Sequence, residues 1–152
     1  MSSQSVFEVE GWYADVPNGP HLVGRRCTVC GSVFFPPLYS FCKNPRCGSP
    51  DVDDVALGRR GRLWSWTTNE FAPPPPYVAG DPFVPYTVAA VELESERMIV
   101  LGQLARDADP SSLRTGAEME VVLESLYERD GVEHVVWKWK PVDGPAVEQK
   151  SR

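Results

Sequence analysis

The chain has 152 residues, 42% of them hydrophobic, and a net charge of −6. This length suits one ordinary domain, or a small metal-stabilised module followed by a domain of about 90 residues. No apolar run approaches the roughly 20 residues of a membrane span. Residues 1–20 also lack the basic segment and apolar run of a secretory signal. We therefore expect a soluble, cytoplasmic protein with no membrane partner.

The negative charge is concentrated in the C-terminal part of the chain. Residues 61–152 carry nine basic and fifteen acidic side chains, whereas residues 1–60 carry six of each. Affinity for nucleic acid comes largely from Lys and Arg side chains that displace counterions from phosphates. This charge distribution argues against a nucleic-acid partner.

Residues 1–21 hold apolar side chains at irregular spacing and end in Pro17, Gly19 and Pro20. The spacing does not define a helix, and the prolines close the segment. We interpret it as an N-terminal docking arm or a short helix that ends before the prolines. An arm that folds over its own domain is an equally good interpretation.

The most informative motif is a pair of short cysteine loops with eleven residues between them. A tetrahedral zinc ion takes four soft ligands, and two loops of this kind supply two thiolates each. The glycine after each second cysteine suits such a loop, because glycine adopts positive φ at low cost. The predicted ligands are the four cysteines of the chain, Cys27, Cys30, Cys42 and Cys47.

Two alternatives to zinc fit the sequence less well. Disulfides need an oxidising compartment, and a Cys-x2-Cys redox motif is expected near a βαβ pattern, which is missing here. Four thiolates would leave the metal no open position for water, so we expect a structural zinc. The sequence therefore predicts a zinc-binding module over residues 22–57, with Phe34 and Phe35 as its local core.

From residue 58 onward the pattern changes to short strands separated by turns. A proline-rich loop, Phe71–Pro85, interrupts them. No convincing long helix occurs, and we expect a mainly β fold with a small closed or nearly closed barrel over residues 58–141. Residues 142–152 are predicted to be a flexible tail. The five strand candidates are 62–69, 86–94, 97–105, 118–127 and 133–140.

Four tryptophans lie in pairs on the first and last predicted strands. Trp137 and Trp139 alternate with lysines that should point to water, Lys138 and Lys140, so we assign these two tryptophans to the core. Trp64 and Trp66 share one face of the first strand, but alternation does not decide which face is buried. They are either core or interface residues, or a platform on which the bases of single-stranded nucleic acid stack.

Two further segments are candidates for ligand or partner contact. Arg59, Arg60 and Arg62 form the one concentrated basic patch, which either grips phosphate, such as the diphosphate of a coenzyme, or is a solvated linker. The proline-rich loop is stiff and aromatic, and we expect it to dock a partner or to form a lid over a substrate. Its candidate residues are Phe71, Tyr77, Phe83 and Tyr86. The alternative is a surface loop that only caps the barrel.

Catalytic motifs are missing from the sequence. It holds two histidines, and it has no Gly-x-Ser-x-Gly, glycine-rich phosphate loop or His-Glu-x-x-His motif. We expect no catalytic residue in this chain.

The ordered combination of these motifs resembles the DUF35 family. The first cysteine pair is followed by Phe34-Phe35-Pro36-Pro37 and then by the second pair with Gly48-Ser49. The similarity continues through the later motifs and covers about residues 20–141. The second cysteine loop of this chain, Cys42–Cys47, is longer than is common in the family. The later motifs are Gly61–Thr67, Pro85–Leu93, Leu101–Leu104, Leu113–Gly116 and Val121-Val122.

The resemblance implies a rubredoxin-like zinc ribbon followed by a five-stranded OB-fold barrel. Members of this family are small non-catalytic partners of thiolase-fold enzymes and help to hold or pass the acyl-CoA. The resemblance thus implies an accessory subunit of an acyl-CoA C-acyltransferase (thiolase) or thiolase-like aldolase complex. In such a complex the arginine patch is the candidate site for coenzyme A phosphates, and the proline-rich loop is the candidate for docking or for lining an acyl channel. A thiolase needs a nucleophilic cysteine, and a chain whose cysteines all bind zinc has none to spare. An OB-fold module that binds single-stranded nucleic acid is the alternative, because fold alone does not fix function.

Overall fold

The computed structural model describes residues 4–16 and 19–142. Strands dominate this part of the chain, which confirms the mainly β prediction. No helix in the described ranges is long and apolar enough to cross a bilayer. The elements are β1 (Gln4–Phe7), β2 (Tyr13–Val16), β3 (Gly19–Cys27), β4 (Val33–Phe34), β5 (Val52–Ala56), β6 (Arg60–Asn69), β7 (Tyr86–Leu93), β8 (Ile99–Leu104), the 3-10 turn η1 (Pro110–Ser112), β9 (Glu118–Arg129) and β10 (Val132–Pro141).

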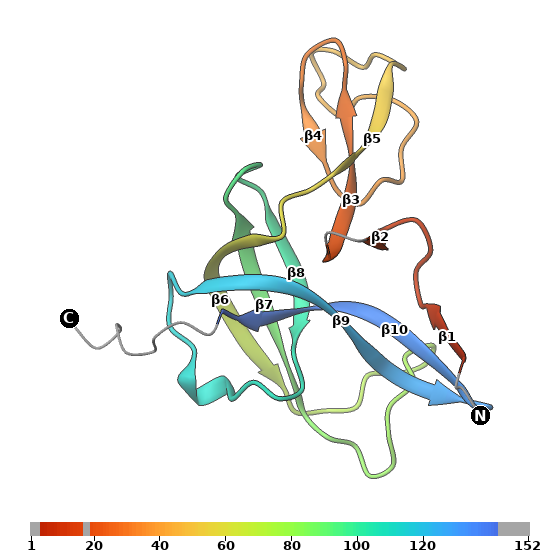
Figure 1. Cartoon of the computed structure of the whole chain (residues 1–152), viewed down its shortest axis with the longest axis vertical. Helices are drawn as coiled ribbons and strands as arrows, with labels where there is room; N and C mark the ends of the chain where they lie inside the picture. Colours follow the sequence, from red (N-terminus) through yellow and green to blue (C-terminus); the bar gives the residue numbers. More distant parts are fainter. Residues whose placement is uncertain (1–3, 17–18, 143–152) are drawn as a thin grey trace.

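Strands β6 to β10 form a closed five-stranded barrel, as predicted. In the order β8, β7, β6, β9, β10 each strand pairs antiparallel with the next, and β10 returns to β8 in parallel. Strand β1 extends the sheet by pairing in parallel with β10. Figure 1 shows the barrel in the lower half of the molecule, with β1 at its edge.

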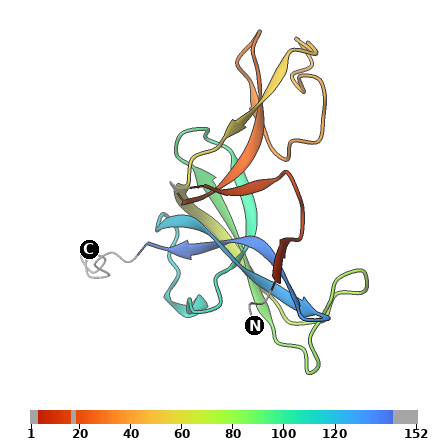
Figure 2. The same cartoon turned by 45° about the vertical axis from the view of Figure 1, so that its right-hand side comes forward.

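A second, smaller sheet holds the cysteine loops. Its central strand is β3, which pairs antiparallel with β2, β4 and β5. Figures 1 and 2 show this sheet projecting from one end of the barrel, while the proline-rich loop between β6 and β7 lies at the opposite end. The two predicted functional regions are therefore separated along the long axis of the molecule.

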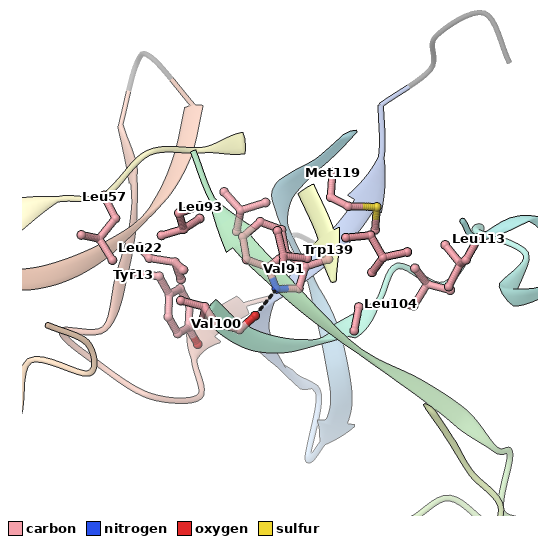
Figure 3. Packing of buried hydrophobic residues seen from close by; sticks show 13 residues of the cluster. Tyr13, Leu22, Leu57, Val91, Leu93, Val100, Leu104, Leu113, Met119 and Trp139 are labelled. Atoms are coloured by element: carbon pink, nitrogen blue, oxygen red, sulfur yellow. Dashed lines mark hydrogen bonds between the residues drawn. The ribbon is translucent and has the colours of Figure 1, made fainter. Parts of the chain in front are cut away.

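The barrel core follows from strand alternation. In β7 the side chains of Thr87, Ala89, Val91 and Leu93 are buried and those between them are partly exposed, because successive residues point to opposite faces. Trp139 is fully buried, and its indole N–H donates to the Val100 carbonyl at 3.2 Å. This bond is the dashed line in Figure 3. The assignment of Trp139 to the core is confirmed.

The core extends beyond the barrel toward the small sheet. Leu22 of β3 and Leu57, which follows β5, are buried in the same cluster as Leu93 and Trp139. Figure 3 shows Leu22, Leu57 and Tyr13 on one side of Val91 and Met119 on the other. Burial of such side chains contributes about 1.5–3 kcal/mol each, so the junction between the two sheets is part of the core.

The described part of the N-terminal arm pairs with its own chain. The Tyr13 hydroxyl donates to the Val135 carbonyl and accepts from the Val9 amide at 3.2 Å. Trp12 packs against Phe35 of the small sheet at 5.6 Å and against Trp137 of the barrel at 6.1 Å between ring centroids. The arm therefore folds over its own domain, the alternative that the sequence left open. Its docking role stays a prediction.

Two expectations about side-chain direction were wrong. Trp64 and Trp66 do not share a face: a β-bulge between Leu63 and Ser65 shifts the register, so that Trp64 is 60% exposed and Trp66 packs against the core. Lys138 does not point to bulk water, since it is only 4% exposed.

The predicted flexible tail, 142–152, lies outside the described residues except for Val142. The Val142 amide donates to the Glu118 carbonyl at 2.9 Å. The last described residue is therefore still tied to the barrel.

Candidate metal centre and neighbouring sites

The four cysteine sulfurs converge at the far end of the small sheet. Cys27 ends β3, Cys30 lies in the turn after it, and Cys42 and Cys47 lie between β4 and β5. All four sulfur atoms lie within 4.8 Å of one another. The cysteine spacing in the sequence and the three-dimensional structure thus indicate the same four-thiol cluster.

The sulfur positions fit a tetrahedral zinc ion. Cys27 Sγ lies 3.8 Å from Cys47 Sγ, and Cys30 Sγ lies 3.6 Å from Cys42 Sγ. Zinc–sulfur bonds of about 2.3 Å in a regular tetrahedron place neighbouring sulfurs about 3.8 Å apart. A disulfide would need about 2.05 Å, so the geometry fits a metal and not a pair of disulfides.

Backbone amides point at the sulfurs. The amides of Val29 and Cys30 donate to Cys27 Sγ at 3.4 Å, and the Asn44 amide donates to Cys42 Sγ at 3.4 Å. Donors of this kind stabilise the thiolate form that binds metal. Hydrogen bonds with the Ser32 hydroxyl and amide lower the pKa of the Cys30 thiol to about 6.

The turns explain how the unequal loops reach the same geometry. Gly31 and Gly48 have positive φ, at 82° and 63°, as the sequence predicts. In the longer second loop the Asn44 side chain accepts from the Arg46 amide at 3.0 Å, and the Asn44 carbonyl accepts from the Cys47 amide at 2.9 Å. Asn44 thus organises the two extra residues. Four protein thiolates leave no position for water, and the chemistry of this centre is structural.

The three arginines of the basic patch do not converge on a shared vacant site. Arg60 bridges Glu118 at 3.2 Å and Glu120 at 3.3 Å. Arg62 contacts Glu94 at 3.1 Å. Arg59 donates instead to the Pro20 carbonyl at 2.9 Å. A phosphate at Arg60 or Arg62 would have to displace carboxylates, and Arg59 alone of the three has no carboxylate partner among the described residues.

Three of the four candidate aromatic residues, two from the proline-rich loop and Tyr86 at the start of β7, gather into one cluster. Tyr77 stacks on Tyr86 at 5.6 Å, and Phe83 meets Tyr86 edge-on at 6.2 Å between centroids. The side-chain amide of Gln103, on β8, donates to the Tyr77 hydroxyl at 3.4 Å. Phe71 is 80% exposed and stands apart.

This aromatic cluster lines a cavity of about 550 Å³ between the loop and strands β8 and β10. Lys138 is also part of its lining. Strand alternation placed Lys138 on the outer face of the barrel. The loop residues that line the cavity with it, such as Tyr77, lie about sixty residues earlier in the chain, so local spacing does not reveal this neighbourhood.

Comparisons with known proteins agree with this architecture. Residues 19–53 match the family model described as the ChsH2 rubredoxin-like zinc ribbon domain, and residues 54–124 match the ChsH2 C-terminal OB-fold domain. A solved structure described as the Ltp2-ChsH2(DUF35) aldolase aligns with a TM-score of 0.55 and 30% identity, over 80% of this chain and 84% of that chain.

Curated relatives cover most of the chain as well. A DUF35 domain-containing scaffold protein from Methanothermobacter thermautotrophicus is 34% identical over 83% of this chain and 90% of its own length. The benzoylsuccinyl-CoA thiolase subunit BbsA from Thauera aromatica is 32% identical over 81% of this chain and 78% of its own length. By its cysteine cluster, its barrel and these relatives, the chain belongs to the DUF35 family with ChsH2-type zinc ribbon and OB-fold domains.

Proposed function

We propose that this chain is a non-catalytic accessory subunit of a thiolase-type acyl-CoA complex. In this role it packs on a thiolase-fold catalytic subunit and helps to hold or pass the acyl-CoA. The observation that carries the proposal is its similarity, over 80–83% of the chain, to proteins named as a thiolase subunit, as a scaffold and as the DUF35 part of an aldolase. The proposed complex is a thiolase or a thiolase-like aldolase.

The cysteine cluster supports a non-catalytic role. A structural zinc held by Cys27, Cys30, Cys42 and Cys47 uses every thiol in the sequence. A thiolase forms its acyl-enzyme on a cysteine, so the acyl-transfer chemistry belongs to the partner in this proposal.

Exposed apolar side chains support a partner interface. On the outer face of the barrel, Leu101, which pairs with Ala90, and Trp64, at the bulge in β6, are each about 60% exposed. On the zinc ribbon, Val29 is 64% and Leu38 59% exposed. Large apolar patches on a protein surface commonly mark sites of interaction with another protein. In the proposal both surfaces, and the arm over residues 1–21, are candidates for contact with the catalytic subunit.

The acyl-CoA roles are distributed over two regions. Arg59 is the best placed of the basic patch to meet a coenzyme A phosphate, because Arg60 and Arg62 already pair with carboxylates. Tyr77, Phe83 and Tyr86 are the proposed acyl-channel residues.

Co-expression with the thiolase-fold subunit of the same genome tests the proposal. The two chains should elute together from size-exclusion chromatography, and Leu101→Glu should weaken the complex because it places a charge on the exposed apolar face. Glu128→Lys, at an exposed position near the β9–β10 turn, is the matched control and should leave the complex intact. Separate elution of the two wild-type chains would contradict the proposal.

The nucleic-acid alternative has less support in the structure. A stacking platform needs adjacent exposed aromatic side chains, and Trp66 packs against the core while Trp64 alone is exposed. If the alternative held, the chain would bind single-stranded nucleic acid with an affinity that falls steeply as salt is added.

A further inference from the structure

The cavity under the proline-rich loop has the size and walls of a small-molecule site. Its volume of about 550 Å³ falls within the roughly 300–1,000 Å³ of known ligand pockets. Tyr77, Phe83 and Tyr86 form one wall, and Leu126 contributes from β9. The apolar part of a ligand could pack against the flat faces of these aromatic rings.

The charges around this cavity are unusual for the chain. Its lining contains two cations, Arg106 and Lys138, and no carboxylate, although the whole protein carries a net charge of −6. Lys138 is 4% exposed, and a buried ammonium group is costly unless it is paired. The lining is therefore positive where the rest of the protein is negative.

One carboxylate outside the lining, Glu124, partly neutralises these cations. Its Oε1 atom lies 3.5 Å from Lys138 Nζ and accepts from the Arg106 backbone amide at 3.0 Å. The Arg106 guanidinium donates to the Ser125 carbonyl at 3.1 Å, which carries no formal charge. Two cations therefore face one carboxylate, and one positive charge remains unbalanced beside the cavity. Burial lowers the pKa of Lys138, Glu124 opposes this and Arg106 adds to it.

We infer that this cavity binds a small carboxylate with an apolar body, such as an arylalkanoate. The carboxylate faces Lys138 and Arg106, and the apolar body lies against Tyr77, Phe83 and Tyr86. A charge-assisted hydrogen bond to a poorly hydrated ammonium is the strongest polar contact that such a site offers. The inference does not rest on the proposed accessory role, since every residue involved belongs to this chain.

The test compares two probes of the same shape on the full-length, zinc-loaded chain. 3-Phenylpropanoate carries the carboxylate, and 3-phenylpropanamide replaces it with a neutral amide. Isothermal titration calorimetry should give a dissociation constant about tenfold or more lower for the carboxylate. Amide NMR shifts should move at Tyr77, Tyr86 and Gln103. Equal affinity for the two probes, or no saturable binding of the carboxylate, would overturn the inference.

Three variants locate the site. Lys138→Met keeps the length of the side chain without its charge and should abolish the preference for the carboxylate. Lys140→Met, two residues away and paired with Asp107 at 3.3 Å, is the matched control and should bind like the wild type. Ala79→Trp adds bulk to the loop wall, keeps Lys138, and should abolish binding of both probes. If Lys138→Met fails to fold, the Ala79→Trp variant still tests the location of the site. Undiminished carboxylate binding by a folded Ala79→Trp chain would place the site outside this cavity.

Because these measurements use the isolated chain, their failure is distinct from failure of the accessory role. If the chain co-elutes with a thiolase-fold subunit but does not bind the carboxylate, only the inference of a ligand site is contradicted.

Discussion

Replacing Gly102 by alanine should destabilise the barrel strongly, although the change adds only one methyl group. Gly102 lies on β8 beneath two indoles. A Cβ atom there would lie 2.9 Å from Trp137 Nε1 and 2.9 Å from Trp139 Cδ1, and Cβ atoms in proteins essentially never come within 3.0 Å of another nonbonded heavy atom. The backbone of Gly102 does not have positive φ, so the whole cost comes from this crowding and not from backbone strain.

The size of the effect follows from the two indoles. Overpacking of a dense core costs about 1–3 kcal/mol. Displaced indoles would also weaken their N–H bonds, Trp137 to the Leu101 carbonyl at 3.1 Å and Trp139 to the Val100 carbonyl at 3.2 Å, at about 0.5–1.5 kcal/mol each. We therefore expect a loss of about 2–6 kcal/mol in the free energy of unfolding, a large part of the roughly 5–15 kcal/mol of a typical domain.

Urea unfolding followed by tryptophan fluorescence measures this loss. Gly58→Ala is the control, because a Cβ there meets its nearest neighbour, a Glu96 oxygen, at 3.4 Å, an ordinary contact. It should stay within about 1 kcal/mol of the wild type. If Gly102→Ala were as stable as Gly58→Ala, the two indoles would not pack over β8 as described.

Three further predictions concern the metal, the arm and the buried lysine. Metal analysis should give one zinc per chain, and Cys42→Ser should lose it and unfold the small sheet, whereas Thr28→Ser should keep it. Tyr13→Phe removes the hydroxyl that bridges Val9 and Val135 and should cost about 1–3 kcal/mol, with faster amide exchange in β1. Since burial lowers the pKa of Lys138, the unfolded chain keeps that proton to higher pH. The free energy of unfolding should then rise with pH between the folded and unfolded pKa values, and Lys138→Met should remove this slope in a pH series of urea titrations.

Local patterns were enough to predict the zinc ribbon and the barrel strands. The four cysteines and two glycines define their loops within a few residues, because metal-ligand spacing and positive φ are local requirements. Strand β7 shows the same: its alternation alone places Thr87 and Leu93 in the core. The bounds of the five barrel strands differ from the predicted ones by at most two residues, whereas strands β1 to β5 were not predicted.

The errors came from contacts between distant parts of the chain. The bulge beside Trp64 reverses side-chain direction, and nothing in the local sequence marks it. Lys138 is buried and lines a cavity together with Tyr77, which lies about sixty residues earlier in the chain. The carboxylate partners of Arg60 and Arg62, which are Glu94, Glu118 and Glu120, are also distant in sequence and are brought to the patch by strand pairing; the phosphate role of the patch stays a prediction. Period and spacing do not encode such long-range contacts.

The aromatic contacts also explain how a small metal-bound sheet can be fixed on the barrel. Phe35 of the ribbon packs edge-on against Trp137 of the barrel at 5.8 Å, and Trp12 of the arm contacts both. Aromatic pairs of this geometry contribute about 0.5–1.5 kcal/mol each beyond their buried area. The ribbon, the arm and the barrel are therefore joined through one aromatic cluster.

The most direct test of the accessory role is purification of the tagged protein from its native host at low salt, with mass spectrometry of whatever accompanies it. The account predicts a thiolase-fold protein in stoichiometric amount. Recovery of the chain alone, or with nucleic acid that dissociates as salt is raised, would contradict it.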